Sequence, residues 1–483
     1  MRPTGWHLPG SGRRRGLIVA AAVAIACGAV GTPAASASNW QPVFFEPNSL
    51  LTEPSTRAAT VAQLQRLGAH ALRILLTWKN VAPRPNSPTR PHFDATDPAD
   101  YEWGTLPSVL EEAKRLHWSV LLTVTSPVPK WATSTHRDNL TRPNDREFAE
   151  FMTAAGREFG SEVSVWAIWN EPNQVGWLLP QFNSNGTPAS PSIYRGLFFA
   201  GYSGLRSAGI ARPKVLMGET APFGNSEVDA RREGTFHNVS PLAFLRGALC
   251  LSSQYQKARQ CGELPASGYA HHAYTNAQGP SYIPPNPDEV TIGTLGRLVQ
   301  ALNLAARAHA VRSNLPIYLT EFGINTRPNS LGVPPATQAE QDAIAEHIAW
   351  ENPRVAAFSQ YALRDDPIPR HHAPGGWIGF QTGLETAAGT PKPLFFAWPL
   401  PLVVRREGHG YYLWGQVRPA HGVTHVQVMV LPKRGGHWRL LATVQTGALH
   451  YWVLRSSVPG VCWHVRWVSP SHRVYEGPAI PAS

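Results

Sequence analysis

The stretch Val165-Trp166-Ala167-Ile168-Trp169-Asn170-Glu171-Pro172 joins a short apolar run to a glutamate and a proline. A second junction of this kind is Pro316-Ile317-Tyr318-Leu319-Thr320-Glu321-Phe322-Gly323. Apolar runs of about four to eight residues that stop at punctuating residues are typical of buried β-strands. We therefore expect both Glu171 and Glu321 to lie where a strand ends.

The two stretches belong to a rhythm of strand-like runs that alternate with amphipathic, helix-like segments over residues 38–400. Repeated β-α units of this kind predict a parallel sheet, and eight of them predict a closed (β/α)₈ TIM barrel. The predicted strands are 42–45, 71–77, 119–125, 164–169, 214–218, 268–273, 317–320 and 355–360. The predicted helices are 55–67, 106–116, 144–159, 191–208, 241–249, 291–309 and 337–350, with a last one near Leu394.

Residues 401–483 follow a different pattern, in which short runs with period two are separated by turn residues. The runs 411–417, 424–431, 438–446, 450–454 and 462–469 predict a small all-β sandwich, similar to Ig-like or fibronectin type III-like modules. Its tryptophans invite a carbohydrate-binding hypothesis, but a core role is favoured for Trp414, Trp438, Trp452 and Trp467.

Residues 1–37 have the pattern of a signal peptide. Arg13-Arg14-Arg15 precedes an apolar run over 17–30, and Ala35-Ser36-Ala37 supplies small residues for cleavage after Ala37. We therefore expect a secreted or extracytoplasmic protein. A twin-arginine signal and a lipoprotein anchor at Cys27 are alternatives, the second disfavoured because Ala24 stands where an aliphatic residue is expected. No later run reaches the roughly 20 apolar residues of a membrane span, so none is predicted in the mature chain.

Export permits a disulfide between Cys250 and Cys261, which are close enough in sequence to close a small loop. Whether they are bonded stays open at this point. Cys462 would then be an odd thiol, which we expect to be a small buried hydrophobe rather than a nucleophile.

Charge and histidine spacing narrow the range of ligands. The formal net charge is +11, but the arginines are scattered and no basic run is interleaved with aromatics, so nucleic-acid binding is not expected. The pairs His271-His272 and His371-His372 would point to opposite faces of an extended backbone, which disfavours a metal site. No metal, no organic cofactor and a monomeric state are predicted.

In a barrel of this kind the carboxyl ends of the strands meet at one mouth, where such folds place their sites. There the sequence puts acids, an amide, imidazoles and indoles, a composition suited to a sugar. Cleavage of a glycosidic bond requires one protonated and one ionised carboxyl group. The residues expected at the mouth are Arg73, Trp78, Trp131, Asn170, Glu171, Glu219, His271, His272, Tyr274 and Glu321.

The segments Trp169-Asn170-Glu171-Pro172 and Thr320-Glu321-Phe322-Gly323 resemble glycoside hydrolase clan A, the (β/α)₈ retaining glycosidases. The resemblance covers most of residues 40–400. His272-Ala273-Tyr274 matches a pattern at strand six, and the segment from Asp365 to Pro393 is similar to the last barrel segment of families 5 and 39.

The resemblance implies a role for each matching residue. Glu171 would be the acid/base and Glu321 the nucleophile of a double displacement at a β-glycosidic bond. Asn170 would bind the sugar 2-hydroxyl, Arg73 would support the nucleophile, and Tyr274 would hold Glu321 by a hydrogen bond. The implied partner is an oligosaccharide or polysaccharide, without a cofactor.

Further substrate contacts are expected from His272, Trp78, Trp131 and Trp377, although barrel-top packing is an equal alternative for Trp78 and Trp131. Clan members often place a tryptophan at the end of strand eight, where this chain reads Gln360-Tyr361-Ala362. The sugar platform would then be Tyr361 or Trp377.

Some alternatives stay open at this stage. Glu219, Asp365 and Asp366 are rival carboxylates, for which structural pairing or substrate contact is the favoured explanation. A non-catalytic glycan-binding barrel and a transglycosylase are the competing functions. The sequence leaves the sugar, the linkage and the choice between endo and exo action undecided.

Overall fold

The computed structural model describes residues 41–45, 50–228, 237–369, 371 and 378–482. Eight parallel strands close into a barrel, because β1 (Gln41–Phe45) pairs with both β2 (Ala71–Thr77) and β8 (Val355–Tyr361). Between them in order lie β3 (Ser119–Thr125), β4 (Val165–Ile168), β5 (Val215–Thr220), β6 (Gly268–His272) and β7 (Ile317–Glu321). The predicted TIM barrel is confirmed.

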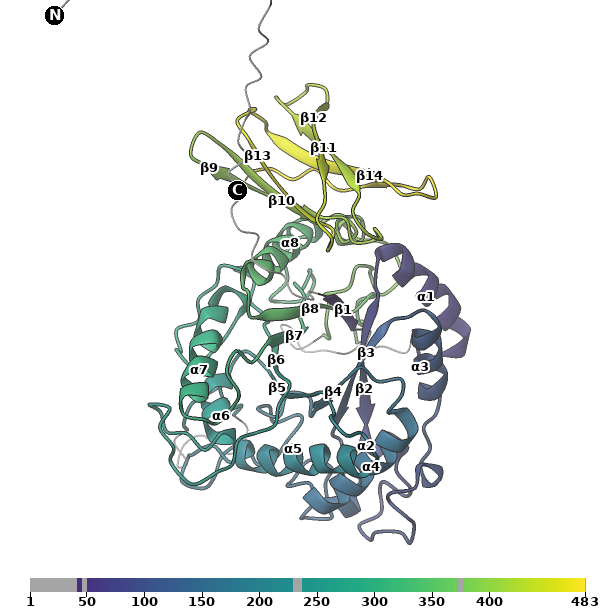
Figure 1. The fold of residues 1–483 in the computed structure, drawn as a ribbon, viewed down its shortest axis with the longest axis vertical. Helices are drawn as coiled ribbons and strands as arrows, with labels where there is room; N and C mark the ends of the chain where they lie inside the picture. Colours follow the sequence, from purple (N-terminus) through teal and green to yellow (C-terminus); the bar gives the residue numbers. More distant parts are fainter. Residues whose placement is uncertain (1–40, 46–49, 229–236, 370, 372–377, 483) are drawn as a thin grey trace, which may run out of the picture. The chain divides into compact units, whose positions relative to one another are not determined.

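Helices surround the strands as an outer ring (Figure 1). Helix α3 illustrates why they pack there: Leu106, Val109, Leu110 and Ala113 recur at helical spacing and are its buried residues. The ring and its short additions consist of α1 (Pro54–Leu67), α2 (Trp78–Val81), α3 (Leu106–Arg115), α4 (Asp145–Phe159), α5 (Ser190–Ser207), α6 (Pro241–Ala248), α7 (Leu295–Arg307), α8 (Pro335–Glu351) and α9 (Pro393–Ala397).

Local signals explain several helix boundaries. Asn144 caps α4, and its side-chain oxygen accepts hydrogen bonds from the backbone N–H groups of Arg146 and Glu147. Gly68 ends α1 in the left-handed region, with φ of 81°. A Cβ atom there would lie 2.7 Å from the backbone of Arg418, so both the backbone angle and the close approach require glycine.

Residues beyond 400 form two antiparallel sheets around a second apolar core, which includes Leu413, Val428, Trp463 and Val465. One sheet has the order β13-β10-β9 and the other β12-β11-β14-β15. The predicted sandwich is confirmed. Its strands are β9 (Leu402–Glu407), β10 (Gly410–Gln416), β11 (His425–Leu431), β12 (Arg439–Gln445), β13 (Tyr451–Ser456), β14 (Cys462–Val468) and β15 (Val474–Glu476).

Two of these strands were not predicted. In β9, three buried residues are followed by Arg405, Arg406 and Glu407, so the strand lacks the period-two alternation that marks its neighbours. The other, β15, has only three residues. Its partner in the sheet is β14, and pairing partners of this kind are not visible in a single sequence.

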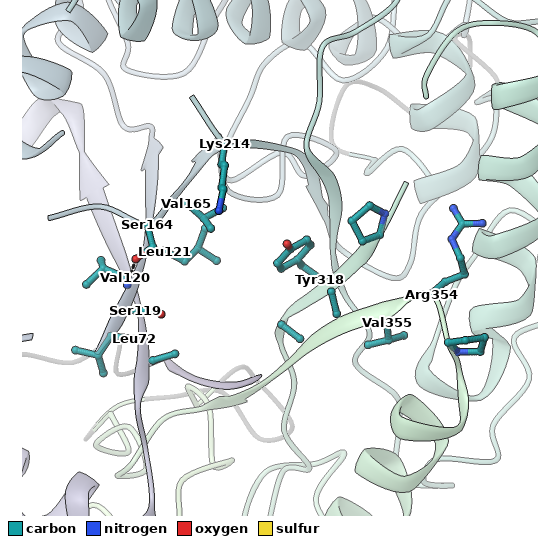
Figure 2. Close-up of a pocket in the computed structure, with 15 residues that line it drawn as sticks. Leu72, Ser119, Val120, Leu121, Ser164, Val165, Lys214, Tyr318, Arg354 and Val355 are labelled. Atoms are coloured by element: carbon teal, nitrogen blue, oxygen red, sulfur yellow. Dashed lines mark hydrogen bonds between the residues drawn. The ribbon is translucent and has the colours of Figure 1, made fainter. Parts of the chain in front are cut away.

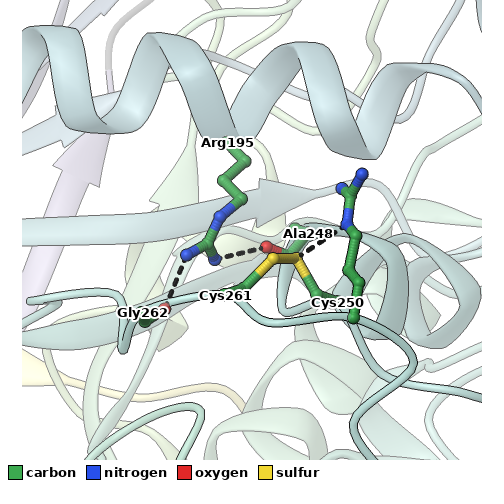
Figure 3. The surroundings of a disulfide bond; sticks show 6 residues. Arg195, Ala248, Cys250, Cys261 and Gly262 are labelled. Atoms are coloured by element: carbon green, nitrogen blue, oxygen red, sulfur yellow. Dashed lines mark hydrogen bonds between the residues drawn. A yellow bond between two sulfur atoms is a disulfide. The ribbon is translucent and has the colours of Figure 1, made fainter.

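Cys250 and Cys261 are bonded, and the bridge lies beside helix α5 (Figure 3). Arg195 of that helix donates to the backbone oxygens of Ala248, at 2.9 Å, and Gly262, at 2.5 Å. The bridge therefore ties the end of α6 to a loop that Arg195 also holds. Cys462 is a free thiol that is only half-buried, so the expectation of a fully buried residue is wrong.

The amino-terminal end of the barrel holds a cavity of about 450 Å³ (Figure 2). Apolar side chains such as Val120 and Val165 line it together with the ionisable residues Lys214, Tyr318 and Arg354. None of the described residues that line this cavity is a carboxylate. Within the part of the chain that the structure describes, no helix has the length and apolar character needed to cross a membrane.

Candidate active site

The carboxyl ends of strands β2 and β4 to β7 bring the predicted polar residues together at the opposite end of the barrel. Arg73 lies within β2, Asn170 and Glu171 follow β4, Glu219 lies near the end of β5, and Glu321 ends β7. His272 ends β6, and Tyr274 follows two residues later. Residues that are far apart in the sequence thus meet in one cluster, as the barrel topology predicts.

A sharp change of backbone direction positions Asn170 and Glu171. Trp169 and Glu171 have positive φ angles of 71° and 39°, and for residues other than glycine such angles cost about 1–3 kcal/mol each. Backbone hydrogen bonds hold the turn in place: Asn170 N–H donates to Thr125 Oγ1 at 3.0 Å, and Glu171 N–H donates to the carbonyl oxygen of Glu219 at 3.0 Å. The turn therefore directs both side chains with little freedom.

Arg73 is the buried cation at the centre of the cluster. Its Nη1 donates to Glu321 Oε1 at 2.7 Å, and its Nη2 donates to Asn170 Oδ1 at 2.7 Å. Its Nε and Nη2 form a two-bond contact with Glu219 at 3.0 and 2.7 Å, and Thr123 donates to the same carboxylate at 3.1 Å. The two buried carboxylates raise the pKa of Arg73, so the guanidinium stays charged.

The side chain of Arg73 is fully buried, so it binds the carboxylates rather than the substrate. The contact with Glu321 agrees with the supporting role that the resemblance implied for Arg73. Glu219 is also fully buried on Arg73, which agrees with structural pairing as its explanation.

His272 connects the two candidate carboxylates. Its Nδ1 lies 2.9 Å from Glu171 Oε1 and 3.5 Å from Glu321 Oε2. Burial lowers the pKa of His272 to about 4, so the ring is neutral at ordinary pH. In the tautomer with a proton on Nδ1, the ring donates a hydrogen bond to Glu171 Oε1. The His272 side chain is fully buried and contacts Glu171, and the predicted substrate contact stays a prediction.

Tyr274 donates from its hydroxyl to Glu321 Oε2 at 3.0 Å, which is the contact that the sequence resemblance implied. Glu321 therefore receives hydrogen bonds from a cation and a phenol. Arg73 donates hydrogen bonds to Glu321, Glu219 and Asn170, and among the described residues the ion-pair partner given for Glu171 is the neutral His272. The contacts thus stabilise the charged form of Glu321 more than that of Glu171.

Burial raises the pKa of Glu171 to about 7. The positive charge of Arg73 opposes this shift, the negative charge of Glu219 adds to it, and a hydrogen bond from Trp177 opposes it. Burial also raises the pKa of Glu321, while His272 and Arg73 act in the opposite direction. A carboxyl with a pKa near 7 can hold a proton and release it at neutral pH.

One donor atom each of Glu171, His272 and Glu321 lies within 4.8 Å of the others. Such a group has the donor types of a divalent-cation site. However, Glu321 already accepts from Arg73 and Tyr274, and Arg73 supplies a positive charge at the position of a cation. These contacts are those of a hydrogen-bonded carboxylate pair.

Three tryptophans were predicted to contact the substrate. Trp78 is fully buried and stacks on Phe151, with ring centroids 5.1 Å apart and planes at 6°. Trp131 is 3% exposed and packs edge-on against Trp78. Of the two alternatives given for these residues, the structure agrees with packing in the core at the top of the barrel rather than with a substrate platform. Trp377 lies outside the described residues.

Other aromatic residues surround the carboxylates. Tyr361 is nearly buried and packs against Phe380 and Tyr274, at centroid distances of 4.5 and 6.1 Å. Trp177 is half-buried beside Glu171, and its carbonyl oxygen accepts from Ser126 Oγ at 2.6 Å. The contact of Trp177 with Glu171 was not predicted, because nothing in the local sequence indicates that this loop folds back over Glu171.

The remaining rival carboxylates have structural partners. Asp365 forms an ion pair with Lys392 at 2.9 Å, and both side chains are buried. Asp366 accepts from the backbone N–H of Phe380 at 2.8 Å. These contacts agree with structural pairing and leave Glu171 and Glu321 as the pair that faces the mouth.

No family model and no curated protein matches the sequence. Solved structures do match the fold. A family 39 glycoside hydrolase from the gut symbiont Bacteroides cellulosilyticus WH2 superposes with a TM-score of 0.50 and 15% identity, over 88% of this chain and 80% of that chain. A glucosidase from Croceicoccus marinus gives 0.50 and 10%, over 86% and 93%. At these identities the likeness concerns the fold, and at that level the predicted resemblance to (β/α)₈ glycosidases is confirmed.

Proposed function

We propose that this protein is a retaining β-glycoside hydrolase. The observation that carries the proposal is a pair of carboxylates with unequal surroundings, at the ends of β4 and β7 of one barrel. One oxygen of each carboxylate and a ring nitrogen of His272 all lie within 4.8 Å of one another. Retaining enzymes hold their carboxyl groups about 5–5.5 Å apart, whereas inverting enzymes need about 6.5–9.5 Å to admit a water molecule. The close spacing supports the retaining mechanism.

In the first step, Glu321 attacks the anomeric carbon while protonated Glu171 donates its proton to the departing glycosidic oxygen. A covalent glycosyl ester on Glu321 results, and Glu171 becomes ionised. Glu171 then removes a proton from water, the water oxygen bonds to the anomeric carbon, and Glu321 is released as a carboxylate. Neither step requires a cofactor.

The surroundings of each carboxylate support this division of roles. Arg73 and Tyr274 hold Glu321 in one orientation and favour its charged form. Glu171 has a pKa raised to about 7, as a residue that first gives and then takes a proton requires. Arg73 donates to Asn170 Oδ1. We propose that the Nδ2 group of Asn170 donates to a sugar hydroxyl.

The test is a panel of aryl β-glycosides and neutral or acidic polysaccharides, assayed with wild type, Glu321→Ala and Glu171→Ala. We expect Glu321→Ala to lose activity by about 10⁴-fold or more. Azide should restore activity to Glu171→Ala and yield a β-glycosyl azide, because a small anion needs no general base.

The matched control is Asp366→Asn, which changes a carboxylate near the mouth that makes a structural backbone contact. It should keep activity within about fivefold of wild type. Full activity of Glu321→Ala would show that the nucleophile is assigned wrongly. Glycan binding without cleavage by wild type would support a binding protein instead.

We also infer that the protein is exported. The signal-like residues 1–37 support this, and so does the bond between Cys250 and Cys261, because disulfides persist in oxidising compartments. Amino-terminal sequencing of protein from the culture medium should begin at Ser38. Retention of the full chain inside cells with both cysteines reduced would contradict export.

A further inference from the structure

The C-terminal segment carries most of the net positive charge of the chain. Residues 401–483 hold nine Lys and Arg residues against two acids, Glu407 and Glu476. Three of the arginines are neutralised by ion pairs: Arg405 with Glu351 at 3.6 Å, Arg418 with Glu346 at 2.8 Å, and Arg455 with Glu407 at 2.7 Å. The question is where the remaining cations gather.

The hairpin between β11 and β12 collects three of them. Lys433, Arg434 and Arg439 are exposed, and none forms an ion pair with an acid of the described chain. The hairpin borders the edge of its sheet, because β12 pairs with β11 and with no other described strand. A local excess of positive charge at such an edge attracts anionic groups.

Trp438 lies in the same hairpin, and its exposure separates it from the other tryptophans of the sandwich. It is 38% exposed, whereas Trp414, Trp452, Trp463 and Trp467 are between 0 and 3% exposed. The core role favoured from the sequence therefore holds for Trp414, Trp452 and Trp467 and is wrong for Trp438. An indole that the core does not use is available to a ligand.

The register places the Trp438 ring on the outward face of the sheet. Met429 pairs with Leu440 on one side and with His464 on the other, while its neighbours Val428 and Val430 are buried in the core. The ring of Trp438 meets the ring of His464 edge to face, with centroids 4.4 Å apart. Leu440 is 53% exposed and extends the apolar floor of this face.

We propose that the surface composed of Trp438, Lys433 and Arg434 binds an acidic polysaccharide; Arg439 pairs with the buried Val430 and so lies on the other face of the sheet. The indole would stack on the apolar face of a pyranose ring, and the cations would pair with carboxylate groups of neighbouring sugars. The positive charge of this surface and the exposed indole of Trp438 indicate a polyanion whose units contain rings on which the indole can stack. The choice of a glycan among such polymers rests on the proposed function of the barrel, since tethering to a polymer raises the local concentration of its bonds.

The test measures binding of the full mature chain carrying Glu321→Gln, so that the polymer is not consumed. Polygalacturonate and alginate are the acidic probes, and dextran is the neutral probe. We expect at least about tenfold tighter binding to an acidic probe, with an affinity that falls as salt is raised. Equal affinity for dextran, or no binding to either acidic polymer at low salt, would overturn the proposal.

Trp438→Ala should weaken binding at least about tenfold, as truncation of an aromatic anchor commonly does. Trp438→Tyr should keep most of the affinity, because a ring is retained. Both variants should cleave a soluble aryl β-glycoside at the wild-type rate on a Glu321 background, and their melting temperatures report folding. If Trp438→Ala binds as tightly as its parent, the ring has no role and the proposal falls.

Replacing Lys433 and Arg434 together by Gln should weaken binding about tenfold and reduce its salt dependence. The matched control removes the same charge from exposed positions of the barrel through Arg206→Gln and Arg212→Gln. It should bind within about twofold of its parent. An equal loss in the control would mean that net charge alone attracts the polymer.

Two further probes separate glycans from other polyanions. Double-stranded DNA and vesicles with anionic phospholipid are offered at the same salt concentration. We expect weaker binding than to the acidic glycan and no dependence on Trp438. Tighter binding to either probe with loss in Trp438→Ala would assign the surface to that partner. The binding assays are independent of cleavage, so an inactive barrel would leave their outcome unchanged.

Discussion

Within the described residues, Arg73 and Arg418 are buried and neutralise carboxylates, and their surroundings differ. Arg73 in the barrel mouth donates from all three of its nitrogens, to Glu219, Glu321 and Asn170. Arg418 in the C-terminal segment donates to Glu346 of α8 at 2.8 Å and lies over the ring of Trp398. Both guanidinium groups are fully buried.

The second group leaves polar atoms without partners. Arg418 Nη1, Glu346 Oε1 and Asp342 Oδ1 are buried and make no hydrogen bond within the described part of the chain. Burial, reinforced by the negative charge of Glu346, raises the pKa of Asp342 to about 8, so this carboxyl is protonated at neutral pH.

The comparison shows that solvent exposure decides whether a carboxyl with a raised pKa can act on a bound molecule or can affect only the stability of the fold. In the mouth, the Glu171 side chain is 18% exposed, so a raised pKa there can act on a substrate. Asp342 is 2% exposed, so its raised pKa can affect only stability. Similar buried charges therefore fit the proposed reaction in one place and the attachment of the C-terminal segment to α8 in the other.

The largest effect is expected from Arg73→Lys. A lysine is a point charge and cannot reach Glu219, Glu321 and Asn170 together, so kcat on an aryl β-glycoside should fall about 100-fold or more. The free energy of unfolding should also fall by several kcal/mol, because buried carboxylates lose hydrogen bonds. Activity of the folded variant within about threefold of wild type would show that Arg73 does not position the nucleophile.

Arg418→Met should destabilise the protein by about 3–5 kcal/mol, because Glu346 is left buried and unpaired. Unfolding in urea provides the measurement, and kcat of the folded fraction should stay within about twofold of wild type. The double variant Arg418→Met with Glu346→Met should recover most of the stability, since an apolar pair replaces the ion pair. A loss of kcat in the single variant would show that the two arginine groups are coupled.

The pH dependence of activity should show the pKa of Glu171. Glu171 must be protonated to assist the departing sugar, so kcat/KM should fall about tenfold per pH unit above about pH 7. Glu171→Ala, assayed with a leaving group that needs no acid, should lack this alkaline limb. An alkaline limb of unchanged position in that variant would assign it to another group.

The smallest effect is expected from Asp342→Asn and concerns stability. The pKa of Asp342 is raised from 3.8 to about 8 in the folded state, so folding takes up a proton. The stabilisation is complete below about pH 4 and is lost as pH rises toward 8. Asp342→Asn should therefore gain about 1–2 kcal/mol relative to wild type between pH 6 and 8, and urea unfolding at several pH values measures it. If the difference in the free energy of unfolding between Asp342→Asn and wild type did not change with pH, Asp342 would not be protonated in the folded state.

Much of the fold follows from local pattern. The two strands predicted as 71–77 and 119–125 have these bounds in the structure, and Asn144 and Gly68 act at helix ends as their residue types indicate. Buried parallel strands are continuous apolar runs, so their positions are visible in the sequence. The strands that escaped prediction, β9 and β15, are stabilised by pairing with neighbours rather than by their own alternation.

The candidate site divides in the same way. Glu171, Glu321 and Tyr274 lie where strand ends and the sequence resemblance place them. The burial of Trp78 and Trp131 was not predictable, because an indole that packs on Phe151 and one that faces a sugar look alike in sequence. The two hydrogen bonds from Arg73 to Glu219 were not predictable either, because they depend on distances between side chains of different strands.

By itself, the sequence determined the barrel, the sandwich and the two glutamates at strand ends, because hydrophobic periodicity and chain order are local properties. Only the tertiary structure decided which charges meet: Arg73 with Glu219 and Glu321, His272 with Glu171, and Arg418 with Glu346. It also decided that Trp438 stays outside the core. Burial and distance set the pKa of a group and the exposure of a ring, and both arise when remote segments pack together.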